Sequence, residues 1–120
     1  MDLQLEVKHL SERQAVIEAK GRLTAVTAPA MKAHIRELVD GGWTEILCDL
    51  RAVAFLDSSG LAALVSGLKS VREHDGWLKL VGLTPQVATI FRLTMLDRVF
   101  ETYSTVEAAL SEGVPAAGGA

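Results

Sequence analysis

Four consecutive residues, Asp57, Ser58, Ser59 and Gly60, place a carboxylate and two hydroxyls just ahead of an apolar run with helical spacing. Asp and Ser side chains accept hydrogen bonds from the free N–H groups of a first helical turn, so helix capping is one function for this segment. Capping accounts for one polar residue, but not for three in a row followed by a glycine that weakens the turn. Such a helix start, beyond the carboxyl end of a strand, is also where α/β proteins bind anions, and its N–H groups and dipole can stabilise a phosphate carried by a serine. The segment alone leaves both alternatives open: a cap, or a phosphorylation or small-ligand site.

Enzyme signatures are missing elsewhere in the chain. The sequence contains no Gly-x-x-x-x-Gly-Lys phosphate loop, no Gly-x-Gly-x-x-Gly and no Gly-x-Ser-x-Gly elbow. His9, His34 and His74 lie far apart and form no His-x-x-x-His metal pair. The single cysteine, Cys48, lies in an apolar run and is expected to be a small buried hydrophobe. We therefore expect no catalytic residue, no cofactor and no metal; a small hydrolase using Ser58 is the enzyme alternative, and it lacks an identifiable base.

Composition bounds the class of protein. The chain has 120 residues, a formal net charge of -3, 49% hydrophobic residues and 22% charged residues. These values predict one globular domain, residues 1–112, followed by a flexible Gly- and Ala-rich tail, residues 113–120. The mild acidity offers no electrostatic footprint for direct contact with nucleic acid. No apolar stretch is long enough for a membrane span and no secretory signal precedes the domain, so we expect a cytoplasmic protein without membrane contact.

Hydrophobic periodicity and turn residues predict an alternation of strands and helices. Two early strands are close enough for an antiparallel hairpin, and the later strands are separated by helices, which favours parallel pairing. The expected fold is an α/β sandwich with a mixed, mostly parallel central sheet and about four helices. The expected landmarks are a strand at 3–7, a strand at 15–19 ended by Gly21, a helix capped by Thr27, a strand at 45–50, a helix opened by residues 57–60, a strand at 78–81, a helix capped by Thr84, a strand at 99–103 and a last helix opened by residues 104–107.

The segment Phe55–Leu61 resembles the phosphorylation motif of bacterial anti-sigma factor antagonists, which are single STAS domains. That motif runs hydrophobic, Met or Leu, Asp, Ser, Ser or Thr, Gly, Leu. Further similarity covers the chain up to about Leu110, and its strongest parts are Gly21–Leu23, Ile46–Leu50, Leu80–Val87 and Phe91. The resemblance implies a STAS-type sandwich.

The resemblance also implies a function. The family's phosphoacceptor directly follows the motif aspartate, which here makes it Ser58. The unphosphorylated antagonist binds an anti-sigma factor with serine kinase activity and thereby releases the sigma factor; phosphorylation abolishes binding, and a metal-dependent serine phosphatase reverses it. We expect the partner to contact residues 57–60 together with Thr24 and Thr27 of the preceding loop. Thr24 stands where the family often has an acid, so no kinase-docking role is carried over from that acid.

A second function is compatible with the same fold. A STAS domain can also be a subunit of a transporter or of a stress-sensing assembly, with a scaffolding role. The short chain and the serine at position 58 favour the antagonist.

Overall fold

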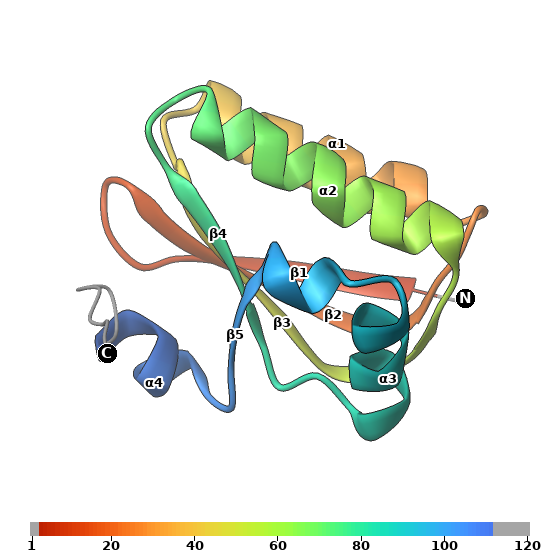
Figure 1. The fold of residues 1–120 in the computed structure, drawn as a ribbon. Helices are drawn as coiled ribbons and strands as arrows, with labels where there is room; N and C mark the ends of the chain where they lie inside the picture. Colours follow the sequence, from red (N-terminus) through yellow and green to blue (C-terminus); the bar gives the residue numbers. More distant parts are fainter. Residues whose placement is uncertain (1–2, 112–120) are drawn as a thin grey trace.

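The computed structural model describes residues 3–111, which form one five-stranded sheet in the order β1-β2-β3-β4-β5. β1 pairs antiparallel with β2, and every later pairing is parallel, because a helix connects each successive pair of strands (Figure 1). The predicted mixed, mostly parallel sheet is confirmed. The strands are β1 (Leu3–His9), β2 (Gln14–Leu23), β3 (Glu45–Leu56), β4 (Trp77–Val81) and β5 (Glu101–Tyr103).

Helices cover the two faces of the sheet unequally. α1 and α2 lie side by side on one face, and the short α4 lies on the opposite face (Figure 1). α3 packs against β3 and is followed by a 3-10 turn, η1. Within residues 3–111 the four α-helices agree with the expected number. Their bounds are α1 (Ala28–Asp40), α2 (Ser58–Arg72), α3 (Pro85–Leu93) and α4 (Val106–Ser111), and η1 spans Leu96–Arg98.

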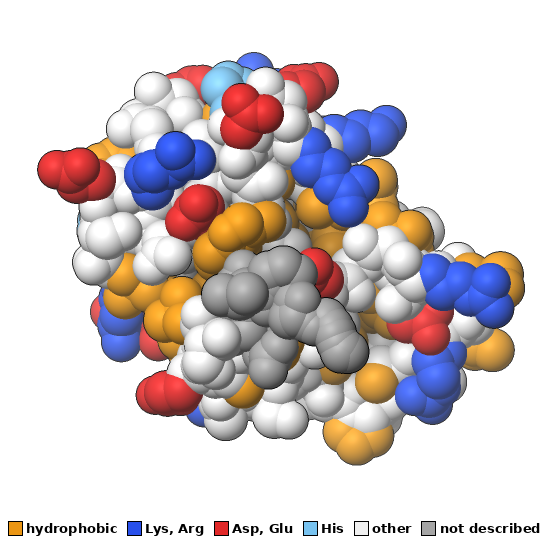
Figure 2. Space-filling view, turned by 60° about the vertical axis from the view of Figure 1, so that its left-hand side comes forward, with side chains coloured by type: hydrophobic (Ala, Val, Ile, Leu, Met, Phe, Trp, Pro, Cys, Tyr) orange, Lys and Arg blue, Asp and Glu red, His pale blue; other side chains and the backbone are white. Residues whose placement is uncertain are grey.

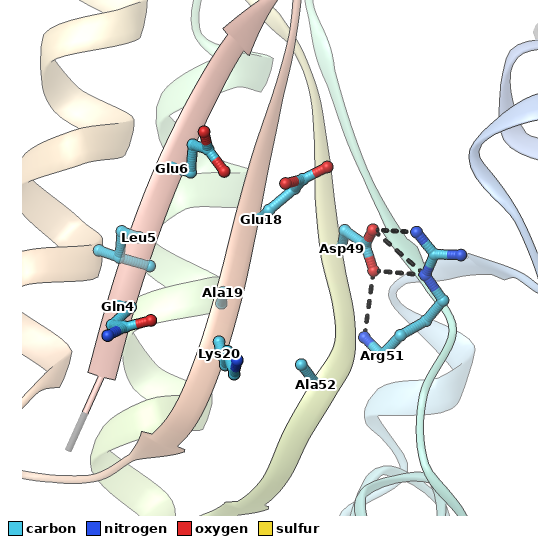
Figure 3. A pocket seen from close by; sticks show the side chains of 9 residues that line it. All are labelled: Gln4, Leu5, Glu6, Glu18, Ala19, Lys20, Asp49, Arg51 and Ala52. Atoms are coloured by element: carbon cyan, nitrogen blue, oxygen red, sulfur yellow. Dashed lines mark hydrogen bonds and ion pairs between the residues drawn. The ribbon is translucent and has the colours of Figure 1, made fainter.

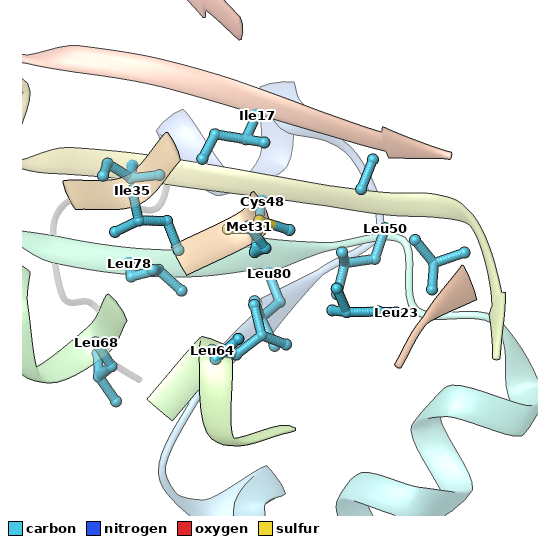
Figure 4. Packing of buried hydrophobic residues seen from close by; sticks show 14 of the residues in the cluster. Ile17, Leu23, Met31, Ile35, Cys48, Leu50, Leu64, Leu68, Leu78 and Leu80 are labelled. Atoms are coloured by element: carbon cyan, nitrogen blue, oxygen red, sulfur yellow. The ribbon is translucent and has the colours of Figure 1, made fainter. Parts of the chain in front are cut away.

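The main core lies between the sheet and the α1–α2 pair (Figure 4). Alternate residues of the strands point into it, and the apolar stripes of the two helices close it. A smaller cluster on the other face joins Val16, Leu47 and Val81 to Ala109 of α4. The centre of β3 is buried on both faces, which explains its continuous apolar sequence. Buried side chains that meet in the main core include Ile17, Met31, Ile35, Cys48, Leu64, Leu68 and Leu80.

Two strands run further than the sequence predicts. Gly21 was expected to end β2, but β2 continues to Leu23, and β3 continues to Leu56 rather than ending at residue 50. The register between β2 and β3 shifts on either side of Gly21, whose φ of 124° favours glycine, and the strand resumes after this irregularity. Leu23 and Leu56 therefore pair directly, so the loops that follow the two strands start side by side. Residue 112 and the predicted tail, 113–120, lie outside the described residues.

Candidate functional site

The candidate site forms where β2 and β3 end, at the same end of the sheet where α1 and α2 begin (Figure 1). The backbone N–H of Asp57 donates to the carbonyl oxygen of Leu23 at 3.1 Å. The carboxylate Oδ2 of Asp57 accepts from the backbone N–H of Ala25 at 3.3 Å. The structure thus brings together the two segments that the sequence singled out, residues 24–27 and residues 57–60.

Asp57 is the N-cap of α2. Its backbone is extended, and its Oδ1 accepts hydrogen bonds from the N–H groups of Ser59 at 2.9 Å and Gly60 at 3.1 Å. These are two of the donors that a helix start leaves without intrahelical partners. The sequence left the capping residue undecided among three polar side chains, and the structure gives that role to the carboxylate.

Gly60 is required by close packing. A β-carbon at this position would lie 2.6 Å from the carbonyl oxygen of Leu23 and 3.2 Å from the Cβ of Leu56. Real Cβ atoms do not approach a backbone oxygen so closely, so the first turn of α2 and the end of β2 would have to separate. The glycine therefore holds the α2 start against β2, which accounts for a residue that weakens the helical turn by itself.

Ser58 is the first residue of α2 and is exposed to solvent, while Ser59 is half-buried. Within residues 3–111 the Ser58 hydroxyl has no hydrogen-bond partner. Capping is carried by Asp57, one position earlier, and so does not account for Ser58. Within the described residues, Ser58 therefore retains a free, accessible hydroxyl at a helix N-terminus.

Thr27 holds the β2–α1 loop from inside. Its side chain is buried, with 7% of the residue exposed, and its hydroxyl donates to the carbonyl of Arg22 at 2.7 Å and accepts from the N–H of Thr24 at 2.8 Å. Thr27 occupies the N-cap position of α1 but makes no side-chain cap bond, so the prediction that it caps this helix is wrong. The hydroxyl of Thr27 instead bonds to the backbone of the turn, at Arg22 and Thr24. Thr24 is half-buried, and its hydroxyl accepts from the N–H of Val26 at 3.3 Å.

Exposed apolar side chains flank the site and were missed by sequence reasoning. Val26 is 79% exposed and Phe55 44% exposed. The guanidinium of Arg22 lies over the Phe55 ring, 5.1 Å from its centroid, because the two residues pair across β2 and β3. A hollow of about 440 Å³ opens beside this pair, lined also by Ala54 and Ile90. Only the register between the two strands reveals this pair, and the sequence alone does not supply that register.

A hollow of about 490 Å³ lies on the open face of β1, β2 and β3 (Figure 3). Asp49 is buried at its margin, where its two carboxylate oxygens accept from the guanidinium of Arg51 at 2.7–3.2 Å. Burial acts to raise the pKa of Asp49, but the hydrogen bonds and charge of Arg51 outweigh it and hold the pKa below its usual value. Asp49 is thus satisfied within the protein and is not poised to bind a ligand.

The remaining reactive groups are inert or dispersed. Cys48 is fully buried, as expected, and burial raises the pKa of its thiol to about 12, so it is a neutral thiol at pH 7. Among residues 3–111 no three His, Cys, Asp or Glu side chains cluster so that they could hold a metal ion. No helix in this range is both long enough and apolar enough to cross a membrane. On the face seen in Figure 2, basic and acidic side chains are interspersed.

Comparisons with known proteins agree with this geometry. Residues 4–109 match the family model of the STAS domain. The chain is 29% identical over 101 residues to an anti-sigma-B factor antagonist of Listeria monocytogenes, covering 84% of this chain and 89% of that protein. No catalytic family is indicated by the matches.

Solved structures extend the comparison to three dimensions. The crystal structure of an anti-sigma factor antagonist from Mycobacterium paratuberculosis superimposes with a TM-score of 0.82 at 29% identity, covering 92% of each chain. A sulfate transporter family protein from Wolinella succinogenes superimposes with a TM-score of 0.74 over 87% of each chain, but at 16% identity it shows a shared fold alone. Since the family match runs through nearly all of the described residues, the chain belongs to the STAS-domain family.

Proposed function

We propose that this chain is an anti-sigma factor antagonist that acts by partner switching. In its unphosphorylated form it binds an anti-sigma factor with serine kinase activity and so releases a sigma factor. Transfer of a phosphate to Ser58 abolishes binding, and a metal-dependent serine phosphatase restores the active form. The relatives from Listeria and Mycobacterium, both antagonists of anti-sigma factors by name, support the general role.

One observation carries the finer proposal: the exposed Ser58 hydroxyl is unengaged while Asp57 caps the helix. A kinase can therefore modify Ser58 without breaking a hydrogen bond of the fold within the described residues. The phosphate adds about -1.5 to -2 charge at neutral pH. The N–H groups and dipole at the start of α2 attract that charge, whereas the neighbouring Asp57 repels it. The two effects oppose each other, so the fold itself needs little change on phosphorylation.

The effect of the phosphate falls on the interface instead. We place the partner over residues 57–60 and over the loop containing Thr24, which hydrogen bonds hold against the α2 start. Thr27 contributes from within, by fixing that loop. A partner packed there must strip water from the phosphate, and any carboxylate of the partner nearby repels it. Each 1.4 kcal/mol lost in this way weakens binding tenfold.

Phosphopeptide mapping tests the assignment. The antagonist is captured with its kinase from the native host, incubated with ATP and examined by intact mass and by peptide mapping. We expect one added phosphate, on Ser58. Ser58→Ala should abolish it, and the matched variant Ser59→Ala should keep it. A phosphate found only on Ser59 or on Thr24 would contradict the proposal.

Hydrogen exchange with and without the kinase tests the surface. We expect protection in residues 24–27 and 57–60 on binding. Protection confined to α4 would place the interface on the opposite face of the sheet. A scaffolding subunit, the alternative suggested by the shared fold, would keep its partner regardless of phosphorylation. A turnover assay with generic ester and phosphate substrates addresses the hydrolase alternative.

A further inference from the structure

β1 forms one edge of the sheet, and within residues 3–111 no strand pairs with its outer side. Its seven residues make it a far longer edge than β5, which has three. The hairpin bond from the N–H of Leu10 to the carbonyl of Gln14 sets the alternation of the β1–β2 ladder. In an antiparallel ladder every second pair exchanges hydrogen bonds, so the even-numbered residues of β1 bond to β2. The N–H and C=O groups of Leu5, Val7 and His9 consequently point outward.

The charges along this edge are incompletely paired. Glu6 lies directly opposite Glu18 of β2 (Figure 3, where both side chains are labelled). Like charges that face each other across two strands are destabilising. The nearby cation, Lys8, forms an ion pair with Glu18 at 3.2 Å. Within the described residues Glu6 has no ion pair. Glu6 is therefore an exposed acid on an open edge, two residues from an exposed lysine.

We propose that β1 pairs with β1 of a second copy of this chain, antiparallel, about a two-fold axis at Val7. This register places Glu6 opposite Lys8 of the second copy, and symmetry repeats the pair. Lys8 then lies between Glu18 of its own chain, with which it forms a diagonal ion pair, and Glu6 of the second copy. Each Glu6 gains a cation that the described residues of its own chain do not supply.

The same charges exclude the neighbouring registers. A two-fold axis perpendicular to the sheet keeps each face of the sheet continuous from one copy to the next. Such an axis must pass between a residue of β1 and the same residue of the second copy. Centring on Glu6 sets Glu6 against Glu6, and centring on Lys8 sets Lys8 against Lys8; both arrangements bring like charges together. Edge lysines commonly prevent strand pairing, but the acid two residues away makes this edge complementary to itself when the axis lies at Val7.

Backbone and apolar groups fit the same register. Val7 faces Val7 of the second copy, and both residues present outward N–H and C=O groups, as a hydrogen-bonded pair requires. Leu5 and Val7 are half-buried against the main core at this edge. Pairing would cover them and extend the apolar face of the sheet from one copy into the next. Centred on Val7, the pairing joins residues 5–9 of β1 in the two copies. Five paired residues form a small interface, so the dimer should depend on protein concentration and weaken with added salt.

Sedimentation velocity over a concentration series tests the proposal with the full chain. We expect a monomer–dimer equilibrium. Glu6→Lys should weaken association by roughly tenfold, because the new lysine then faces Lys8 of the other copy in both symmetry-related pairs. Lys8→Glu should also weaken it. The double variant Glu6→Lys/Lys8→Glu exchanges the charges and should restore the dimer. Glu12→Lys, in the exposed hairpin loop, makes the same charge change as Glu6→Lys and should leave association unchanged.

Several outcomes would overturn it. A monomer at every concentration would do so, and a monomer whose outward N–H groups in β1 resist hydrogen exchange would show that the chain covers its own edge. A dimer that responds equally to Glu6→Lys and Glu12→Lys, or that the double variant does not restore, has a different interface. Thermal melts of each variant establish that it is folded. Neither Glu6 nor Lys8 belongs to the candidate site around Ser58, so this result is independent of the proposed phosphorylation.

Discussion

The starts of α2 and α3 each carry a hydroxyl side chain, Ser58 and Thr84, but only the hydroxyl of Thr84 caps its helix. At α3 the hydroxyl of Thr84 accepts from the N–H of Val87 at 3.4 Å and donates to the carbonyl of Val53 at 3.3 Å. That hydroxyl is engaged by the fold both as donor and as acceptor. At α2 the carboxylate of Asp57 does the capping, and the hydroxyl of Ser58 makes no bond within the described residues. A reactive group is thus kept free when a neighbouring side chain takes over its structural task.

The largest effect on stability is expected at Asp57. Asp57→Ala removes two bonds to the first turn of α2 and the bond to Ala25, and should destabilise the protein by about 1–2 kcal/mol. Asp57→Asn keeps an acceptor oxygen for the first turn and should lose less. Denaturant unfolding measures both variants. An alanine variant as stable as wild type would show that the cap contributes nothing.

A binding measurement separates the free hydroxyl from the cap. Ser58→Asp places a carboxylate in the proposed interface and should weaken binding to the anti-sigma factor by about tenfold or more, since that charge is desolvated without a partner. Ser58→Ala should bind as tightly as wild type. Ser66→Asp adds the same charge at an exposed position two turns further along α2 and is the control. Titration calorimetry decides, and wild-type affinity for Ser58→Asp would remove the basis for the phosphate switch.

At α3 the hydroxyl itself should be structural. Thr84→Ala removes the cap bond to Val87 and the bond to Val53, and should cost about 1 kcal/mol of stability. Thr84→Ser retains the hydroxyl and is the matched control. Thermal unfolding of the two variants provides the measurement. If alanine and serine behave alike, the hydroxyl of Thr84 is not the stabilising group.

The smallest effect is expected for Ser58→Ala in stability. Its hydroxyl makes no bond within residues 3–111, so removal should change the free energy of unfolding by no more than about 0.5 kcal/mol. The same unfolding measurements apply. A loss as large as that of Thr84→Ala would mean that Ser58 shares the capping and would remove the contrast between the two helix starts.

The sequence predicted elements with a local chemical cause. Thr84 followed by proline predicts a helix start, and the structure confirms both the Thr84 cap and the beginning of α3 at Pro85. The sequence was less accurate where a tertiary contact determines where an element ends or what a side chain bonds to. β2 continues past Gly21 because β3 provides a partner beyond the irregularity, and Thr27 turns its hydroxyl into the loop because Arg22 offers a carbonyl there.

The candidate site shows the same division. Local chemistry marked Asp57 and Ser58 as a helix start, but three adjacent polar side chains compete for one set of N–H donors, and only the geometry assigns them. The pairing of Arg22 with Phe55 depends on a strand register that sequence spacing does not contain.

The contact between Gly60 and the carbonyl of Leu23 limits how this domain can be recombined with related ones. The α2 start and the β2–α1 loop fit each other to within the space of a single methyl group. A chimera that takes residues 56–61 from one STAS domain and residues 22–28 from another would join surfaces that do not fit each other. Exchange of binding specificity between such proteins therefore requires transplanting both segments as one unit.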